Sequence, residues 1–102
     1  MKPIHVGLLG IGTVGGGTFS VLRRNQEEIS RRAGRGILIK AVADKNLPRA
    51  RKLVGDSAET TDDAFALVRR PDIDIVVELI GGTTIAKDLI MAAIENGKHV
   101  VT

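Results

Sequence analysis

The chain contains no cysteine, tryptophan or tyrosine, and two phenylalanines are its only aromatic residues. Without cysteine there is no disulfide scaffold and no thiolate metal site, and we expect no metal site of any other kind. The scarcity of aromatic rings argues against binding of single-stranded nucleic acid, which needs stacking platforms. No apolar run approaches the length of a membrane span, and the run before Gly10 is too short for a secretion signal. We therefore expect a cytoplasmic protein without a membrane partner.

Apolar residues make up 43% of the 102 positions, which is enough for the packed core of one small domain over residues 1–102. Because that core must be built from valine, isoleucine, leucine and alanine, we expect layers of helices and strands. The net charge of +3 comes largely from basic residues between positions 23 and 52. Such a cluster attracts anionic partners, but Glu27 and Glu28 are interleaved with it, which favours solvated helix faces. We expect no nucleic-acid partner, since no binding motif is present.

Hydrophobic patterning predicts alternating strands and helices. The expected strands are Ile4–Leu9, Ile37–Asp44, Ile73–Ile80 and His99–Thr102, and a minor strand within Asp56–Thr60 is left open. The expected helices are Val14–Arg32, Leu47–Val54, a third that begins at Thr61 to Asp63 and runs through Arg70, and Ile85–Glu95. Thr61 is the expected N-cap of the third helix, and Asn96-Gly97 the C-terminal cap of the fourth. Near-continuous apolar strands separated by helices predict an α/β fold, a partial Rossmann-type doubly wound parallel sheet of four to five strands.

A glycine-rich loop lies between the first strand and the first helix. Its residues are Gly10, Ile11, Gly12, Thr13, Val14 and Gly15. This is the G-x-G-x-x-G pattern in the strand-to-helix context that dinucleotide binding requires. Gly10 permits the turn, Gly12 lets the pyrophosphate approach the backbone, and Gly15 lets the helix pack closely on the sheet. The N–H groups of Thr13 and Val14 would then face the pyrophosphate, so we predict a site for NAD or NADP.

The end of the second strand carries Asp44 and Lys45. An acidic residue here usually bonds the ribose 2′-hydroxyl of NAD, and a nearby cation accommodates the 2′-phosphate of NADP. Asp44 lies further from the glycines than the usual distance of about 20 residues, which the long first helix explains. A capping role for Asp44 and a solvated position for Lys45 are the alternatives, and cofactor preference stays open.

Two further features stand near the predicted site. Gly81 and Gly82 follow the third strand and either approach the nicotinamide or only begin a helix, alternatives that we weigh equally. Glu78 is a carboxylate in an apolar strand, for which a hydrogen-bonded structural role is favoured. His5 and His99 are isolated and are interpreted as structural. We find no catalytic triad, no paired catalytic carboxylates and no other catalytic residue in the chain.

Four segments together resemble the opening of homoserine dehydrogenases: Val6 to Gly17, Ile39 to Asp44, Asp74 to Gly82 and Asn96 to Thr102. That family interconverts L-homoserine and L-aspartate 4-semialdehyde with NAD or NADP, in the branch leading to threonine, methionine and isoleucine. The resemblance implies cofactor contacts from Ile11, Thr13 and Val14, with Lys45 near the adenosine ribose and Gly81 near the nicotinamide.

The family's chains continue past Thr102 into a substrate domain with the catalytic lysine and acidic residues. The resemblance therefore implies a cofactor domain that binds without turnover, while the substrate and a homo-oligomeric assembly belong to the full-length enzyme. A stand-alone NAD(P)-binding regulatory module is the alternative. The gene sequence beyond Thr102 would distinguish the two.

Overall fold

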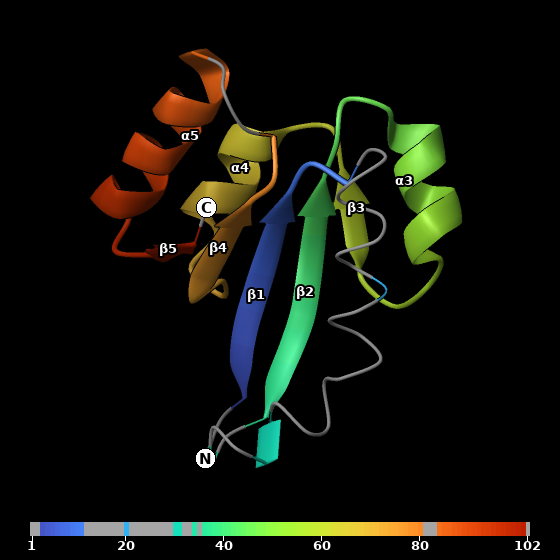
Figure 1. Cartoon of the computed structure of the whole chain (residues 1–102), viewed down its shortest axis with the longest axis horizontal. Helices are drawn as coiled ribbons and strands as arrows, with labels where there is room; N and C mark the ends of the chain where they lie inside the picture. Colours follow the sequence, from blue (N-terminus) through green and yellow to red (C-terminus); the bar gives the residue numbers. More distant parts are fainter. Residues whose placement is uncertain are drawn as a thin grey trace.

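The computed structural model describes residues 3–11, 20, 30–31, 34, 36–80 and 84–101. Five strands form one sheet in the order β3-β2-β1-β4-β5, and every neighbouring pair is parallel (Figure 1). The strands are β1 Ile4–Leu9, β2 Ile37–Ala43, β3 Glu59–Thr61, β4 Ile75–Glu78 and β5 His99–Val101. The predicted Rossmann-type α/β fold is confirmed, and the minor strand left open exists as β3, the edge strand beside β2.

Three helices are described, α3 Leu47–Val54, α4 Ala64–Arg69 and α5 Thr84–Glu95. The α3 helix has its predicted bounds, with proline tolerated in its first turn. The α5 helix ends as predicted, because the N–H of Gly97 donates to Ile94 and that of Lys98 to Ala93. The first predicted helix lies mostly outside the described residues, although its described members, Ser20, Ser30 and Arg31, are helical.

The prediction that Thr61 caps the third helix is wrong. Thr61 is the last residue of β3, where it pairs with Ala43, and its carbonyl accepts from the Asp44 N–H at 2.9 Å. Asp63 is the N-cap of α4 instead, since its Oδ1 accepts from the Ala66 N–H at 3.0 Å. The Thr61 side chain accepts from the Asp63 N–H and so orders the turn before the helix. The strand pairing, which the local pattern did not predict, displaces the cap by two residues.

The predicted third strand is shorter than expected, and β4 covers only Ile75–Glu78. Ile73 belongs to a turn that precedes the strand, because its N–H donates to the carbonyl of Arg70 at 3.3 Å. Ile73 is nevertheless only 1% exposed, because it packs in the core. Its apolar side chain was mistaken for that of a strand residue.

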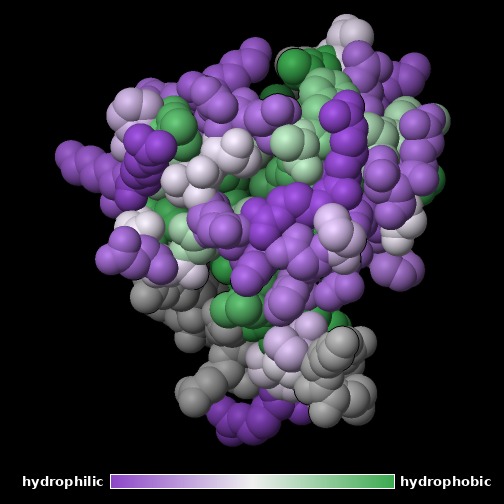
Figure 2. Space-filling view, turned by 180° about the vertical axis from the view of Figure 1, so that it is seen from behind, coloured by the Kyte–Doolittle hydropathy of each residue, from purple (hydrophilic) through white to green (hydrophobic). Residues whose placement is uncertain are grey.

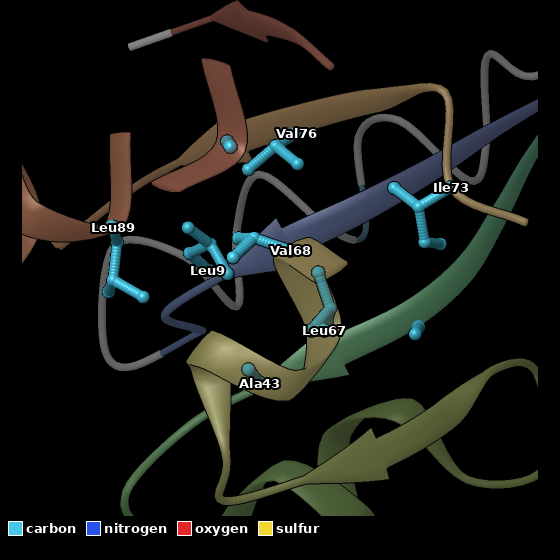
Figure 3. Close-up of a cluster of buried hydrophobic side chains, with 9 residues drawn as sticks. Leu9, Ala43, Leu67, Val68, Ile73, Val76 and Leu89 are labelled. Carbon is cyan, nitrogen blue, oxygen red and sulfur yellow. The ribbon is translucent and has the colours of Figure 1, made fainter. Parts of the chain in front are cut away.

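Two apolar clusters cover the two faces of the sheet. On one face α4 and α5 pack over the central strands, and Leu67 and Val68 of α4 meet Leu9 of β1 and Val76 of β4 (Figure 3). On the other face α3 contributes Ala50 and Val54, which pack with Leu8 and Val42; the full cluster is Val6, Leu8, Ile11, Ile39, Val42, Ala50 and Val54. Both faces are therefore covered, as the continuous apolar strands predicted.

A β-bulge in β2 decides which residues of that strand face which helix. Val6 pairs with Ile39 and Gly7 with Ala41, so Lys40 is an extra residue without a partner in β1. Because side chains alternate along a strand, one extra residue reverses their facing. Ile39 and Val42 consequently share the α3 face, while Ala41 and Ala43 face α4 and α5.

The surface seen from behind is mainly hydrophilic, with hydrophobic groups exposed between the polar side chains (Figure 2). Among the described residues, none of the helices has the length and apolar character needed to cross a membrane.

Candidate functional site

The carboxyl ends of the central strands meet at one edge of the sheet. In the register of the sheet, Leu9 of β1 lies opposite Ala43 of β2 and Glu78 of β4, and Ala43 lies opposite Thr61 of β3. The segments that follow these residues are therefore neighbours in space. Ligands of open parallel sheets bind at this edge, which here contains Gly10, Asp44 and Ile80 after β4.

Gly10 makes the turn out of β1 that the sequence predicted. Its φ is +85°, a conformation that side-chain-bearing residues rarely adopt. Its N–H donates to the carbonyl of Ala43 at 2.7 Å, which ties the start of the loop to the end of β2. A Cβ at this position would lie 2.8 Å from Cγ1 of Ile80, so only glycine leaves the turn in close contact with the end of β4.

Asp44 holds the next residue of the loop. Its Oδ2 accepts from the N–H of Ile11 at 2.7 Å, and its Oδ1 accepts from the N–H of Asn46 at 2.8 Å. The side chain of Ile11 is fully buried in the core on the α3 face. The N–H of Ile11 is therefore bound to Asp44, and the side chain of Ile11 is packed in the core.

Lys45 lies on the surface between β2 and α3. Asn46 follows it as the N-cap of α3, and its side-chain oxygen accepts from the N–H of Arg49 at 3.2 Å. These bonds fix the backbone on the carboxyl side of Lys45, while Asp44 fixes it on the amino side. The ammonium group is thus carried by an ordered turn at the same edge as the glycine loop.

Six predicted site residues lie outside the described residues: Gly12, Thr13, Val14, Gly15, Gly81 and Gly82. Their contacts with a cofactor stay predictions. Glu78 is buried at the end of β4, with 6% of its surface exposed, and it has an interaction partner, which agrees with the structural role favoured from the sequence.

The histidines are not close to the glycine loop along their strands. His5 lies near the amino end of β1, where its Nδ1 donates to the carbonyl of Asp72 at 2.9 Å. His99 begins β5 and is exposed. The structural interpretation of His5 is therefore supported by a specific hydrogen bond.

Two features of the site were not predicted from the sequence. Ile80 adjoins Gly10 across the strand ends and is 39% exposed, so part of its side chain is open to solvent at this edge. The hydrogen bond between Asp44 and Ile11 was also not foreseen. In the sequence, Ile80 and Asp44 are marked only by their positions near the ends of strands. That position does not predict that Ile80 contacts Gly10 or that Asp44 bonds Ile11.

Residues of this edge fit a dinucleotide. The Gly10 turn brings a backbone without a side chain to the strand ends, and Asp44 and Lys45 provide an acceptor and a cation beside it. A ribose needs hydrogen-bond partners, which Asp44 can supply, and a phosphate needs N–H groups or cations, of which Lys45 is one.

Comparison with known proteins agrees with this fit. Residues 10–102 match the family model described as the NAD binding domain of homoserine dehydrogenase. Over its whole length the chain is 70% identical to a homoserine dehydrogenase of Methylobacillus glycogenes and 56% identical to one of Pseudomonas aeruginosa. It spans 25% and 23% of the lengths of those two relatives, respectively.

Solved structures give the same result. A homoserine dehydrogenase from Thiobacillus denitrificans superposes with a TM-score of 0.88 at 61% identity, over 98% of this chain and 23% of that one. One from S. aureus superposes with a TM-score of 0.85 at 31% identity, over 98% of this chain and 25% of that one. With its parallel sheet, its glycine turn and these matches, the chain belongs to the family of homoserine dehydrogenase NAD-binding domains.

Proposed function

We propose that the chain binds NAD or NADP at the carboxyl edge of its sheet, with the pyrophosphate over the loop after β1 and the adenosine ribose beside Asp44 and Lys45. The observation that carries this proposal is the Gly10 turn, with φ of +85° and an N–H bonded to the end of β2. Since the N–H groups of Gly10 and Ile11 are bound within the protein, the amides offered to the pyrophosphate come from residue 12 onward.

We further propose that this site serves the interconversion of L-homoserine and L-aspartate 4-semialdehyde in a longer protein. A bound nicotinamide would accept or donate the hydride. The residues of this chain would bind and orient the cofactor, while the substrate, the groups that exchange the hydroxyl proton and an oligomeric assembly belong to the remainder. The chain's span of about a quarter of its relatives supports this division.

Calorimetric titration of the purified protein with NAD and with NADP tests the site. Saturable binding is expected, and Gly12→Val should abolish it because a branched side chain would occupy the space of the pyrophosphate. Gly10→Ala should weaken binding because alanine is strained at positive φ and its Cβ meets Ile80. Gly55→Ala is the matched control, since Gly55 at the end of α3 has a φ of +62° but no atom of the described residues would lie within 4 Å of a Cβ there. Unchanged binding by Gly12→Val would refute the site.

Lys45→Ala tests the assignment of the ribose end. If the ammonium meets the 2′-phosphate, the variant should lose about tenfold in affinity for NADP, the value of one charge-assisted contact, and little for NAD. Equal losses for the two cofactors would contradict that role.

A further inference from the structure

We propose that Asp44 is a positioning residue, which holds the glycine loop for either cofactor and does not select between them. This inference rests on the proposed function and deepens it. An acidic residue at the end of β2 is expected to favour NAD, because it bonds the 2′-hydroxyl and repels a 2′-phosphate. The contacts of Asp44 with backbone N–H groups indicate a structural role in holding the loop instead.

Both carboxylate oxygens of Asp44 already have backbone donors. Oδ2 accepts from the Ile11 N–H at 2.7 Å and Oδ1 from the Asn46 N–H at 2.8 Å. These are short, charge-assisted bonds, which are roughly twice as strong as bonds between neutral groups. The carboxylate therefore joins two segments, the glycine loop and the turn that begins α3, which are distant in the sequence.

The backbone around Asp44 extends this connection. The N–H of Asp44 donates to Thr61 at the end of β3, and the carbonyl of Ala43 accepts from Gly10 at the end of β1. Three strand ends are thus linked through two consecutive residues. The bond to Ile11 is the last described link before residue 12, so it determines where the cofactor-binding part of the loop begins.

A role in positioning and a role in selection predict different effects of the same substitution. Loss of the Ile11 bond displaces the loop, and the loop meets the pyrophosphate, which is common to NAD and NADP. Affinity for both should then fall together. Loss of a selecting charge should weaken NAD and tighten NADP. Each carboxylate oxygen keeps a second lone pair that could accept from a ribose hydroxyl. We expect the loss of that contact to change the affinities less than the loss of the bond to Ile11.

The test is titration of Asp44→Asn with NAD and NADP in turn. An asparagine side chain has one acceptor oxygen, so it cannot accept from both N–H groups with separate oxygens. We expect both dissociation constants to rise by about tenfold, as for one charge-assisted bond, with their ratio changed less than about threefold. Asp62→Asn is the control, because Asp62 is an exposed carboxylate directly after β3 at the same edge of the sheet. It should leave both constants unchanged.

Asp44→Glu provides a second variant that keeps the charge. Its longer side chain cannot make both bonds without moving the backbone, so it should also weaken both cofactors. Amide hydrogen exchange measured without cofactor gives an independent readout: in Asp44→Asn the Ile11 amide should exchange faster, while that of Val42 in β2 should not.

Three outcomes would overturn the inference: tighter NADP binding by Asp44→Asn, wild-type affinities in Asp44→Glu, or an unchanged exchange rate at Ile11. If the wild-type protein bound neither cofactor, the proposed function itself would fail. That failure is visible before any variant is measured.

Discussion

Gly7, in the middle of the central strand β1, lies against Leu67 of α4. A Cβ built on Gly7 would lie 2.6 Å from Cδ2 of Leu67, a contact that real side chains do not make. Leu67 is 1% exposed and surrounded by the cluster shown in Figure 3, so it has little room to withdraw. The absence of a side chain in the middle of β1 is therefore a packing requirement, separate from the turn at Gly10.

Gly7→Ala should lower the free energy of unfolding by about 1–3 kcal/mol, the usual cost of an extra group in a packed core. Urea denaturation of the purified protein measures this change. The matched control is Gly36→Ala, where, among the described residues, the new Cβ would contact Pro3 alone, at 3.4 Å or more. Combining Gly7→Ala with Leu67→Val should recover part of the loss, because the shorter side chain makes room. If both alanine variants were equally stable, the close approach would not matter.

Helix α4 depends on its cap more than the longer helices do. It has six residues, fewer than isolated helices need, so its ends contribute much of its order. Asp63 accepts from the Ala66 N–H, and Arg69 in the last turn stacks on Phe65 with its guanidinium carbon 5.9 Å from the ring centroid. The sequence predicted Thr61 as the cap, but Thr61 pairs in β3 and Asp63 occupies the capping position.

Asp63→Ala should destabilise the protein by about 1 kcal/mol, the typical value of an N-cap. Thermal unfolding followed by circular dichroism measures the effect as a lower midpoint. Asp62→Ala removes the neighbouring carboxylate, which is exposed and outside the helix, and should have a much smaller effect. A larger loss in Asp62→Ala than in Asp63→Ala would show that the cap is assigned to the wrong residue.

At the scale of the whole molecule, an ionic network joins elements at the amino-terminal edge of the sheet. Arg70, directly after α4, makes a bidentate pair with Asp72 and a 2.6 Å contact with Glu59 of β3. Lys98, before β5, donates to the carbonyl of Arg70. The network thus connects α4 with both edge strands, opposite the edge proposed for the cofactor. Hydrogen bonding to Asp72 raises the pKa of Arg70, which stays charged.

The network makes part of the stability depend on pH. The hydrogen bond from Arg70 lowers the pKa of Asp72 below the usual value of about 3.9. A carboxyl with a lowered pKa in the folded state stabilises the protein above its unfolded-state pKa, and that contribution is lost as the pH falls through the folded-state pKa. Since the pair is partly exposed to solvent, its contribution at neutral pH should stay below about 1 kcal/mol.

Asp72→Asn should therefore be less stable than the wild type at pH 7, and the difference should shrink as the pH falls below about 4. Urea denaturation at several pH values measures both. Asp56→Asn serves as control, because Asp56 is exposed in the loop after α3. A difference that stayed constant down to pH 2, or grew, would contradict the pairing of Asp72 with Arg70.

Much of the fold could be predicted from local sequence patterns. The Gly10 turn, the helix Leu47–Val54 and the bounds of β1 follow from short-range preferences of glycine, proline and apolar residues. Two predictions failed for different reasons: Thr61 pairs in β3 and does not cap the helix, and Ile73 lies in a turn before β4 rather than in the strand. At the site, the sequence identified Asp44 and Lys45 as candidates but not the contacts of either.

The sequence by itself determined the α/β class, the strand-to-helix context of the glycine loop and the family, because each depends on residues that are adjacent or regularly spaced. Only the tertiary structure decided the strand order, the facing of β2 after its bulge, and the choice of Ile11 as the donor to Asp44. These depend on contacts between segments far apart in the chain, whose energies become favourable only when the strands assemble. The loop proposed to bind the cofactor could thus be predicted from the sequence, while its hydrogen bond to the Asp44 carboxylate could not.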